Sequence, residues 1–378
     1  MRRTILLILC WCVVGNVYAE SADCSKRHCL AVVDAGSTGS RIHVFAYDLD
    51  GQQQPTKIDE LQFKKITPGF ASIAPNQEAI NAYLNRLFEN VTDQNIPLYF
   101  YATAGMRLQP PPKQQLYYQA LQQWFASQTQ WKLMESRTIT GREEGVLGWL
   151  AINYKLGAFG VAGKPLAGVI DIGGASVQIT FPVQDVEKID SHDLLNIDVG
   201  GRHIGLFVHS FLGLGQTVLT QQFLDVDSCF ANGYTLPDDS PGKGDASSCQ
   251  RNITQLINDV HAVSHIVKPV IARNTIGSWY AIGSVGQVLG DKPFSFDGNQ
   301  FTSQGMLEQA DSEVCHRQWQ DLYTQYPNIE SLYGYCLFSA YYYALMVDGY
   351  GLQPEQSINY TPPTEVADWS LGVVLHQH

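Results

Sequence analysis

The stretch that decides the fold is Ala31-Val-Val-Asp34-Ala-Gly-Ser-Thr-Gly-Ser-Arg41, which continues as Ile42-His-Val-Phe-Ala46. A second version occurs at Ala167-Gly-Val-Ile-Asp171-Ile-Gly-Gly-Ala-Ser176 and continues as Val177-Gln-Ile-Thr-Phe181. In each copy a short apolar run ends in an aspartate, passes through a glycine-rich turn and resumes as a second apolar run. Short β-branched runs bounded by glycine turns are typical of buried strands. The sequence therefore predicts two strand–turn–strand units, a duplication at the scale of a domain.

The turn in each unit has the composition of an anion site. Glycines let the backbone turn tightly and approach a ligand, and consecutive N–H groups and hydroxyls form a concave surface that binds anions. An aspartate beside such a surface would repel a phosphate unless a divalent cation lay between them. Two such loops facing each other would form a clamp for a metal-bound polyphosphate.

Between and after the two loops, strand and helix patterns alternate. A helix is expected from Asn76 through Phe88, followed by a strand at Pro97–Tyr101. The prolines at 110–112 open a second helix, whose expected apolar face consists of Leu116, Tyr117, Ala120, Leu121 and Trp124. This alternation predicts two α/β lobes with a cleft between them.

Composition and charge limit the class of protein. The 378 residues contain 45% hydrophobic side chains, and the formal net charge is −12. The negative charge argues against nucleic acid or an anionic membrane as a partner. Any attraction for polyphosphate must therefore be local, from backbone dipoles, a few arginines and a metal. No apolar stretch after the N-terminus is long enough to span a bilayer.

The N-terminal residues 1–19 have the charged, apolar and small-residue regions of a secretory signal peptide. An uncleaved membrane anchor is the alternative. Six cysteines follow, and an even count in an exported chain predicts three disulfides. Pairing of neighbours is the simplest of the fifteen connectivities, and the sequence does not choose among them. The six are Cys24, Cys29, Cys229, Cys249, Cys315 and Cys336.

A further candidate site is the acidic pair at Glu143 and Glu144. Thr140 and Glu143 fit a capping box at the start of a helix, which leaves the carboxylate of Glu144 without a structural role. Such a carboxylate could orient and deprotonate a water, although a surface residue that favours the helix dipole is the alternative. Ser176 and Gln178 alternate along their strand and should point to the same side. A serine hydrolase is a poor fit, because Ser176 is followed by a strand instead of a helix.

Five blocks of the sequence resemble the nucleoside triphosphate diphosphohydrolase (apyrase, ecto-ATPase/guanosine diphosphatase) family. The resemblance implies a two-lobed actin-like (ribonuclease H-like) α/β fold with duplicated mixed-sheet domains and an active-site cleft between the lobes. It also implies hydrolysis of nucleoside tri- and diphosphates to monophosphate and orthophosphate, with Ca2+ or Mg2+ as cofactor. The blocks are Asp34–Arg41, Tyr101–Arg107, Gly141–Tyr154, Asp171–Ile179 and Tyr335–Leu352.

The resemblance assigns roles in catalysis and metal binding. Glu144 matches the catalytic base, which would activate water for direct in-line attack on the terminal phosphorus. The residues that match positions around the attacking water are Ser176 and Gln178. The residues that match positions near the metal, largely through waters, are Asp34, Asp171 and Thr103.

The same resemblance assigns ligand-binding roles. The expected phosphate-binding residues are Ser37, Thr38, Gly39, Arg41, Gly173, Gly174, Ala175 and Ser176. Tyr350 and Asn153 are the expected contacts to the nucleotide base. The segment Trp279–Ser284 occupies the place of another base-contacting segment but lacks the usual aromatic residues, so the base preference stays open.

These observations predict a monomeric exported enzyme in the periplasm, the extracellular space or a secretory lumen. The expected lobes are residues 30–154 with 361–378, and residues 155–360. Two alternatives remain for the function. One is an exopolyphosphatase or guanosine-pentaphosphate phosphatase, which would share the same loops. The other is a nucleotide-binding module without catalysis.

Overall fold

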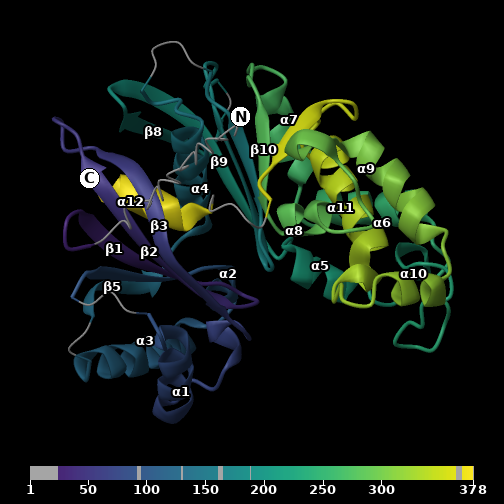
Figure 1. Ribbon diagram of the computed structural model, residues 1–378. Coiled ribbons are helices and arrows are strands. Elements are labelled where there is room, and N and C mark those ends of the chain that lie inside the picture. The colour runs from purple at the N-terminus through teal and green to yellow at the C-terminus, as the bar shows by residue number, and fades with distance from the viewer. Residues whose placement is uncertain are drawn as a thin grey trace, which may run out of the picture.

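The computed structural model describes residues 24–91, 95–128, 131–160, 165–187, 189–362 and 368–377. The expected signal peptide at residues 1–19 lies outside the described residues. The chain forms two mixed β-sheets, which lie in two lobes (Figure 1). The first sheet has the order β3-β2-β1-β4-β5, with β1 (His28–Ala35), β2 (Ser40–Leu49), β3 (Pro55–Ile66), β4 (Pro97–Ala102) and β5 (Lys132–Thr138).

The second sheet has the order β11-β12-β10-β6-β7-β9-β8. Its strands are β6 (Gly168–Ile172), β7 (Ser176–Pro182), β8 (Leu194–Val199), β9 (Arg202–Leu212), β10 (Trp279–Gly283), β11 (Gln300–Thr302) and β12 (Ser357–Tyr360).

The two sheets repeat one topology around the two loops. In the first, β1 pairs with β2 as an antiparallel hairpin and with β4 in parallel. In the second, β6 pairs in the same way with β7 and β10. The two aspartates occupy matching positions, because Asp34 lies opposite Arg41 and Asp171 lies opposite Gln178 in the two hairpins. The predicted duplication is therefore confirmed.

The helices of the first lobe follow the sequence pattern closely. Helix α1 (Gln77–Phe88) begins after Asn76, whose side chain accepts a hydrogen bond from the Ala79 N–H. Helix α3 (Pro111–Ala126) lies beside α1 on one side of the first sheet (Figure 1). The predicted apolar face of α3 is correct except at Leu116, which is 49% exposed. Leu116 lies at the border of the buried stripe, where helical spacing alone cannot separate core from surface.

Helices α4 (Gly141–Lys155) and α12 (Trp369–His376) lie between the two sheets (Figure 1). Helix α4 contacts α12 as well as β6, β7 and β9 of the second sheet. Its first turn carries the predicted capping box of Thr140 and Glu143. Because α4 is anchored at this interface, side chains in its first turn can reach both loops.

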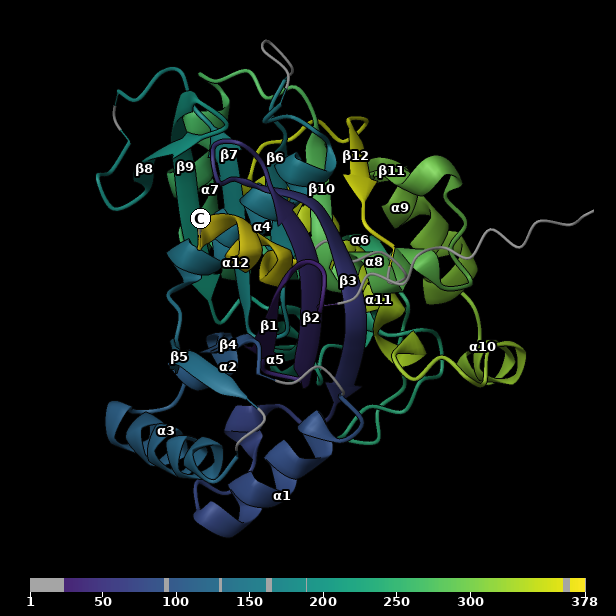
Figure 2. The same cartoon turned by 60° about the vertical axis from the view of Figure 1, so that its left-hand side comes forward.

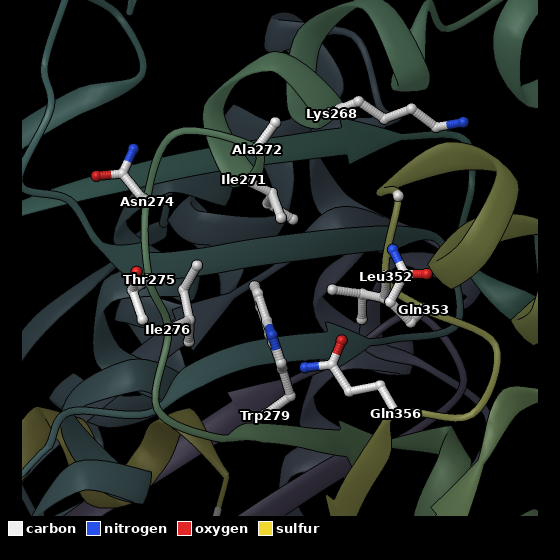
Figure 3. Close-up of a pocket in the computed structure, with 11 residues that line it drawn as sticks. Lys268, Ile271, Ala272, Asn274, Thr275, Ile276, Trp279, Leu352, Gln353 and Gln356 are labelled. Carbon is white, nitrogen blue, oxygen red and sulfur yellow. The ribbon is translucent and has the colours of Figure 1, made fainter.

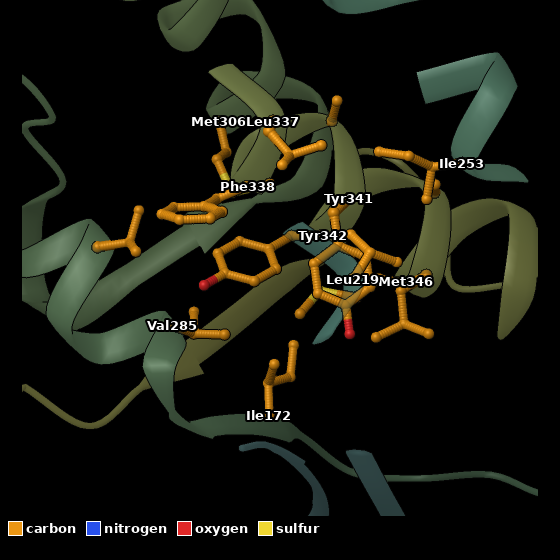
Figure 4. Close-up of a cluster of buried hydrophobic side chains, with 14 of the residues drawn as sticks. Ile172, Leu219, Ile253, Val285, Met306, Leu337, Phe338, Tyr341, Tyr342 and Met346 are labelled. Atoms are coloured by element: carbon orange, nitrogen blue, oxygen red, sulfur yellow. The ribbon is translucent and has the colours of Figure 1, made fainter. Parts of the chain in front are cut away.

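The second lobe is completed by a helical region packed on its sheet. The helices there are α5 (Gln216–Gln222), α6 (Ala246–Asp259), α7 (Val263–Ile271), α8 (Ser284–Gly290), α9 (Ser303–Ala310), α10 (Trp319–Gln325) and α11 (Tyr335–Tyr343). Tyr341 and Tyr342 of α11 lie fully buried in this core (Figure 4). Their hydroxyls donate hydrogen bonds to the Leu214 carbonyl and the Gln216 side chain, so neither buried hydroxyl lacks a partner.

Three disulfides tie neighbouring segments together. They join Cys24 to Cys29, Cys229 to Cys249 and Cys315 to Cys336. The neighbour pairing, which the sequence left as one of fifteen connectivities, is confirmed. Within the described ranges, every helix is too short or too polar to cross a membrane.

Candidate functional site

A cavity of about 630 Å³ lies where the two loops meet. Its walls come from the ends of β1 and β6, the loops that follow them, the first turn of α4 and the N-terminus of α12. The predicted site residues that line it are Asp34, Ser37, Thr38, Arg41, Thr103, Glu144, Asp171, Gly173, Gly174, Ala175 and Ser176. The fold therefore brings most of the predicted residues to one place.

The two loops approach each other closely at Gly174. A Cβ atom at this position would lie 2.5 Å from Ser37 Oγ and 2.8 Å from Thr38 Cγ2. Any larger residue here would have to displace these two side chains of the first loop. The loops are thus held face to face, as a clamp on a shared anion requires.

The Glu144 carboxylate lies at the centre of the site and is only 6% exposed. It accepts a hydrogen bond from Arg107 Nη2 at 2.8 Å, and the same nitrogen donates to Ser176 Oγ at 2.8 Å. Burial raises the pKa of Glu144, and the nearby Arg107 opposes this rise while Asp34 adds to it. The alternative of an exposed surface residue is therefore wrong.

Ser176 and Gln178 point to the same side of β7, as predicted from their alternation. Gln178 Nε2 donates to Ser176 Oγ at 2.7 Å and to Ser210 Oγ at 3.0 Å. Ser176 Oγ thus accepts from both Arg107 and Gln178, which leaves its own proton available to donate into the cavity. Gln178 does not line the cavity itself but supports Ser176 from behind.

Two further buried carboxylates face the cavity from the ends of β1 and β6. Burial raises the pKa of Asp34, and it raises that of Asp171 well above the ordinary value with help from the charges of Glu144 and Asp368. Arg41 Nη1 pairs with Asp34 Oδ2 at 2.7 Å, but Asp34 Oδ1 is buried without a hydrogen-bond partner. The site therefore holds more negative charge than its own cations balance.

His43 is buried beside this site between two acidic side chains. Its Nδ1 lies 2.6 Å from Glu60 Oε1, and its Nε2 lies 3.5 Å from Asp368 Oδ2. Burial alone would lower the pKa of His43, but the charges of Asp368, Glu60 and Asp34 outweigh burial and raise it. The positive Arg41 lies close by, so the imidazolium is one member of a group of alternating charges.

This arrangement predicts a loss of stability at alkaline pH. A raised pKa means that protonation of His43 favours the folded state. The contribution of this protonation to the free energy of unfolding is therefore complete below the pKa of an unfolded histidine, about 6.5, and is lost as pH rises through the pKa of His43 in the folded state. We expect Tm to fall more between about pH 6 and about pH 9 in the wild type than in His43→Gln. Equal losses in the two proteins, measured by circular dichroism, would contradict this role.

Besides Gln178, three predicted site residues do not line the cavity. Tyr350 is fully buried against Phe211, with ring centroids 6.4 Å apart, so its ring has no face free for a base. Asn153 is also buried, and its side chain accepts from the Ala167 N–H and donates to the Trp149 carbonyl. Neither residue is placed to contact a base in the cavity. Gly39 lies in the first turn but does not line the cavity.

A second cavity, of about 510 Å³, lies between α7, the start of β10 and the segment after residue 350 (Figure 3). Trp279 and Gln356 project into it, and Lys268 is the charged side chain among its described lining residues. None of the residues predicted to act in catalysis or to bind phosphate, metal or base lines it, although Trp279 begins the segment that occupies the place of a base-contacting segment. This second cavity lacks the carboxylates and the glycine loops that mark the first cavity.

Sequence reasoning gave no role to Arg107, the residue that links Glu144 to Ser176. Its position at the end of the block Tyr101–Arg107, directly after Thr103, is the signal that could have identified it. His43 and Asp368 were missed as well. No local pattern marks them, because their contacts join β2 to the N-terminus of α12 across the whole length of the chain.

Comparisons with known proteins identify the family of the chain. The profile of the GDA1/CD39 (nucleoside phosphatase) family matches residues 21–378. The chain is 26% identical to "Probable apyrase 3" of Arabidopsis thaliana, covering 96% of this chain and 85% of the relative. It is 28% identical to "Nucleoside-triphosphatase ntp-1" of Caenorhabditis elegans, covering 91% of this chain and 72% of the relative.

The fold has a counterpart in the crystal structure of nucleoside triphosphate hydrolases from Neospora caninum. The TM-score is 0.64 at 16% identity, with 93% of each chain covered. At this identity the likeness concerns the fold alone, and it confirms the expected two-lobed actin-like fold. The family profile spans both lobes and the cavity between them, so the chain belongs to the GDA1/CD39 (nucleoside phosphatase) family.

Proposed function

We propose that this enzyme hydrolyses nucleoside tri- and diphosphates to monophosphate and orthophosphate by direct attack of water on the terminal phosphorus. The observation that carries the proposal is the hydrogen-bonded group of Arg107, Glu144 and Ser176 beside two facing anion loops. Phosphoryl transfer needs little more than positioning and charge stabilisation. The two loops and a bound metal would supply both, and Glu144 would orient the attacking water.

The side chains around the cavity suggest how a water would be held. The free proton of the Ser176 hydroxyl can donate to the water oxygen, while the Glu144 carboxylate accepts one of its protons. This leaves a lone pair of the water directed toward the phosphorus. As the new P–O bond forms, the bridging P–O bond breaks and the nucleoside di- or monophosphate leaves, while a proton passes from the water to Glu144.

A divalent cation fits the donor groups at the ends of β1 and β6. Asp34 Oδ1 is buried without a partner, and the carboxylate of Asp171 lies across the same cavity. Among the described residues no group of three His, Cys, Asp or Glu side chains could hold a metal. Asp34 and Asp171 would therefore share Mg2+ or Ca2+ with waters and substrate oxygens, as is usual for Mg2+. The bound ion would neutralise the charge of the phosphates beside these carboxylates.

The proposal is tested by phosphate release from the purified protein. ATP, ADP, GTP, GDP, UDP and long-chain polyphosphate are assayed with Mg2+ or Ca2+, and again after EDTA. We expect release from both tri- and diphosphates, loss of release with EDTA and recovery when the metal is restored. Release from polyphosphate alone, or nucleotide binding without any release, would contradict the proposal.

The disulfides bear on where the enzyme works. Such bonds persist in oxidising compartments and are rare in the cytosol. Three of them are formed in this chain, two of them in the core of the second lobe. We therefore propose an extracytoplasmic location, with the N-terminal residues acting as an export signal.

A further inference from the structure

Ser210 lies behind Gln178 and Ser176, where helix α4 rests on the second sheet. Strands β7 and β9 are neighbours in that sheet, and α4 contacts both of them (Figure 2). Ser210 of β9 is the partner of Gln178 across the ladder between these strands. Its hydroxyl accepts a hydrogen bond from Gln178 Nε2 at 3.0 Å. Ser210 does not line the cavity, so any effect that it has on the reaction must pass through its neighbours.

The first turn of α4 holds the side chain of Ser210 in place. A Cβ atom at Gly141, the first residue of this helix, would collide with Ser210 Oγ. One turn farther on, a Cβ atom at Gly145 would lie 2.8 Å from Thr180 Oγ1 and 3.2 Å from Gln178 Cβ. Residues four apart lie on one face of a helix, so the two glycines let α4 approach β7 and β9 closely. The Ser210 hydroxyl is thus confined beside Gln178.

The amide group of Gln178 is shared between two serines. Its Nε2 donates one proton to Ser210 Oγ and the other to Ser176 Oγ at 2.7 Å, and Gln178 is only 1% exposed. If the Ser210 hydroxyl were removed, one buried N–H group would lose its acceptor, which costs free energy. The amide would have to turn to recover a partner, and its bond to Ser176 would weaken.

Ser176 is the residue through which these contacts reach the cavity. Its Oγ accepts from Arg107 and from Gln178, which leaves its own proton free to donate to the attacking water. Without the bond from Gln178, only Arg107 would hold Ser176 Oγ, and the direction of the hydroxyl would be less well defined. A water that is held less precisely reacts more slowly, although the substrate still binds.

We propose that Ser210 is a positioning residue for hydrolysis, which holds the Gln178 amide and through it directs the Ser176 hydroxyl at the attacking water. This inference rests on the proposed function for the reaction itself. Ser210 does not touch the substrate in this arrangement. Its removal should therefore lower kcat and leave the affinity for the substrate unchanged.

The first test compares turnover with binding in Ser210→Ala. We expect kcat for ATP to fall by about 2- to 12-fold, the equivalent of one hydrogen bond. Binding is measured by titration calorimetry with Mg2+ and AMP-PCP, an ATP analogue that is not hydrolysed at the terminal phosphate. The affinity for AMP-PCP should stay at its wild-type value.

Thr180→Val is the matched control for a change in packing. Thr180 is buried on β7 and faces Gly145 of α4, as Gln178 does, but its hydroxyl has no hydrogen-bond partner among the described residues. Valine keeps the shape of the side chain, so this variant should retain the wild-type kcat. An equal loss of kcat in Thr180→Val and Ser210→Ala would overturn the proposal, because packing against α4 would then explain both.

A double mutant tests whether Ser210 acts through Ser176. In a Ser176→Ala background, the further change Ser210→Ala should alter kcat by less than about twofold, because residues in one hydrogen-bond network do not act additively. The same fold loss in both backgrounds would overturn the proposal, and so would unchanged kcat or weaker AMP-PCP binding in Ser210→Ala. These results would leave the proposed function intact. A wild type that releases no phosphate from nucleotides would overturn the proposed function and this proposal together.

Discussion

Replacing Glu144 by glutamine is expected to lower kcat for nucleotide hydrolysis by about 10²- to 10⁴-fold, the usual loss when a general base is removed. Glutamine keeps the shape of the side chain and can still contact Arg107, which lies 2.8 Å from the Glu144 carboxylate. It cannot accept a proton from water. The loss should therefore appear in kcat, with little change in the affinity for AMP-PCP.

The neighbouring Glu143 provides the matched control. Its carboxylate accepts from the Thr140 N–H in the capping box and pairs with Arg137 at 2.9 Å, outside the cavity. Glutamine serves in a capping box as well as glutamate does, so Glu143→Gln should keep nearly full activity. Near wild-type turnover in a folded Glu144→Gln protein would remove Glu144 from the role of base.

The pKa of Glu144 adds a pH test to the same variants. Glu144 must be ionised to accept a proton, and burial raises its pKa above the ordinary value of a glutamate. In the wild type, kcat should therefore fall as pH is lowered through this raised pKa, at a higher pH than an ordinary glutamate would give. The decline of kcat at low pH, the acidic limb of the pH–rate profile, should be absent in Glu144→Gln. If this limb persists unchanged in that variant, it reports the protonation of another group.

Replacing Arg107 by alanine is expected to lower kcat/KM by about 10- to 150-fold, the equivalent of one or two charge-assisted hydrogen bonds. Arg107 holds Glu144 and Ser176 in place through one nitrogen, and its other terminal nitrogen donates to the Ile139 carbonyl. Without the guanidinium, Ser176 and Glu144 lose their common partner. Glu144 also loses the positive charge that opposes the rise in its pKa.

The acidic limb of the pH–rate profile should consequently move to higher pH in Arg107→Ala. A purely structural loss would lower the rate without moving that limb. Arg137→Ala is the control, because Arg137 pairs at 2.9 Å with Glu143, the neighbour of Glu144 in the first turn of α4, and is more exposed than Arg107. A profile with the wild-type midpoint in Arg107→Ala would show that Arg107 does not act on the protonation of Glu144.

The sequence by itself determined the features that depend on neighbouring residues. Strand–turn–strand units, the capping box of Thr140 and Glu143, and the shared side of Ser176 and Gln178 follow from local periodicity and local hydrogen bonding. The duplicated hairpins with their aspartates also follow, because each copy carries its own glycine turn. The short separations within the three cysteine pairs made neighbour pairing the simplest choice, and it is correct.

Only the tertiary structure decided which of these local features face one another. Arg107 meets Ser176 across 69 positions of sequence, and no periodicity records such a contact. Tyr350 resembled a ligand-binding aromatic in its motif, yet packing against β9 buries it. Phe63 lies on an edge strand, and it is 54% exposed where it lines the cavity. Burial depends on which elements pack together, and that is set by the free energy of the whole fold rather than by any short segment.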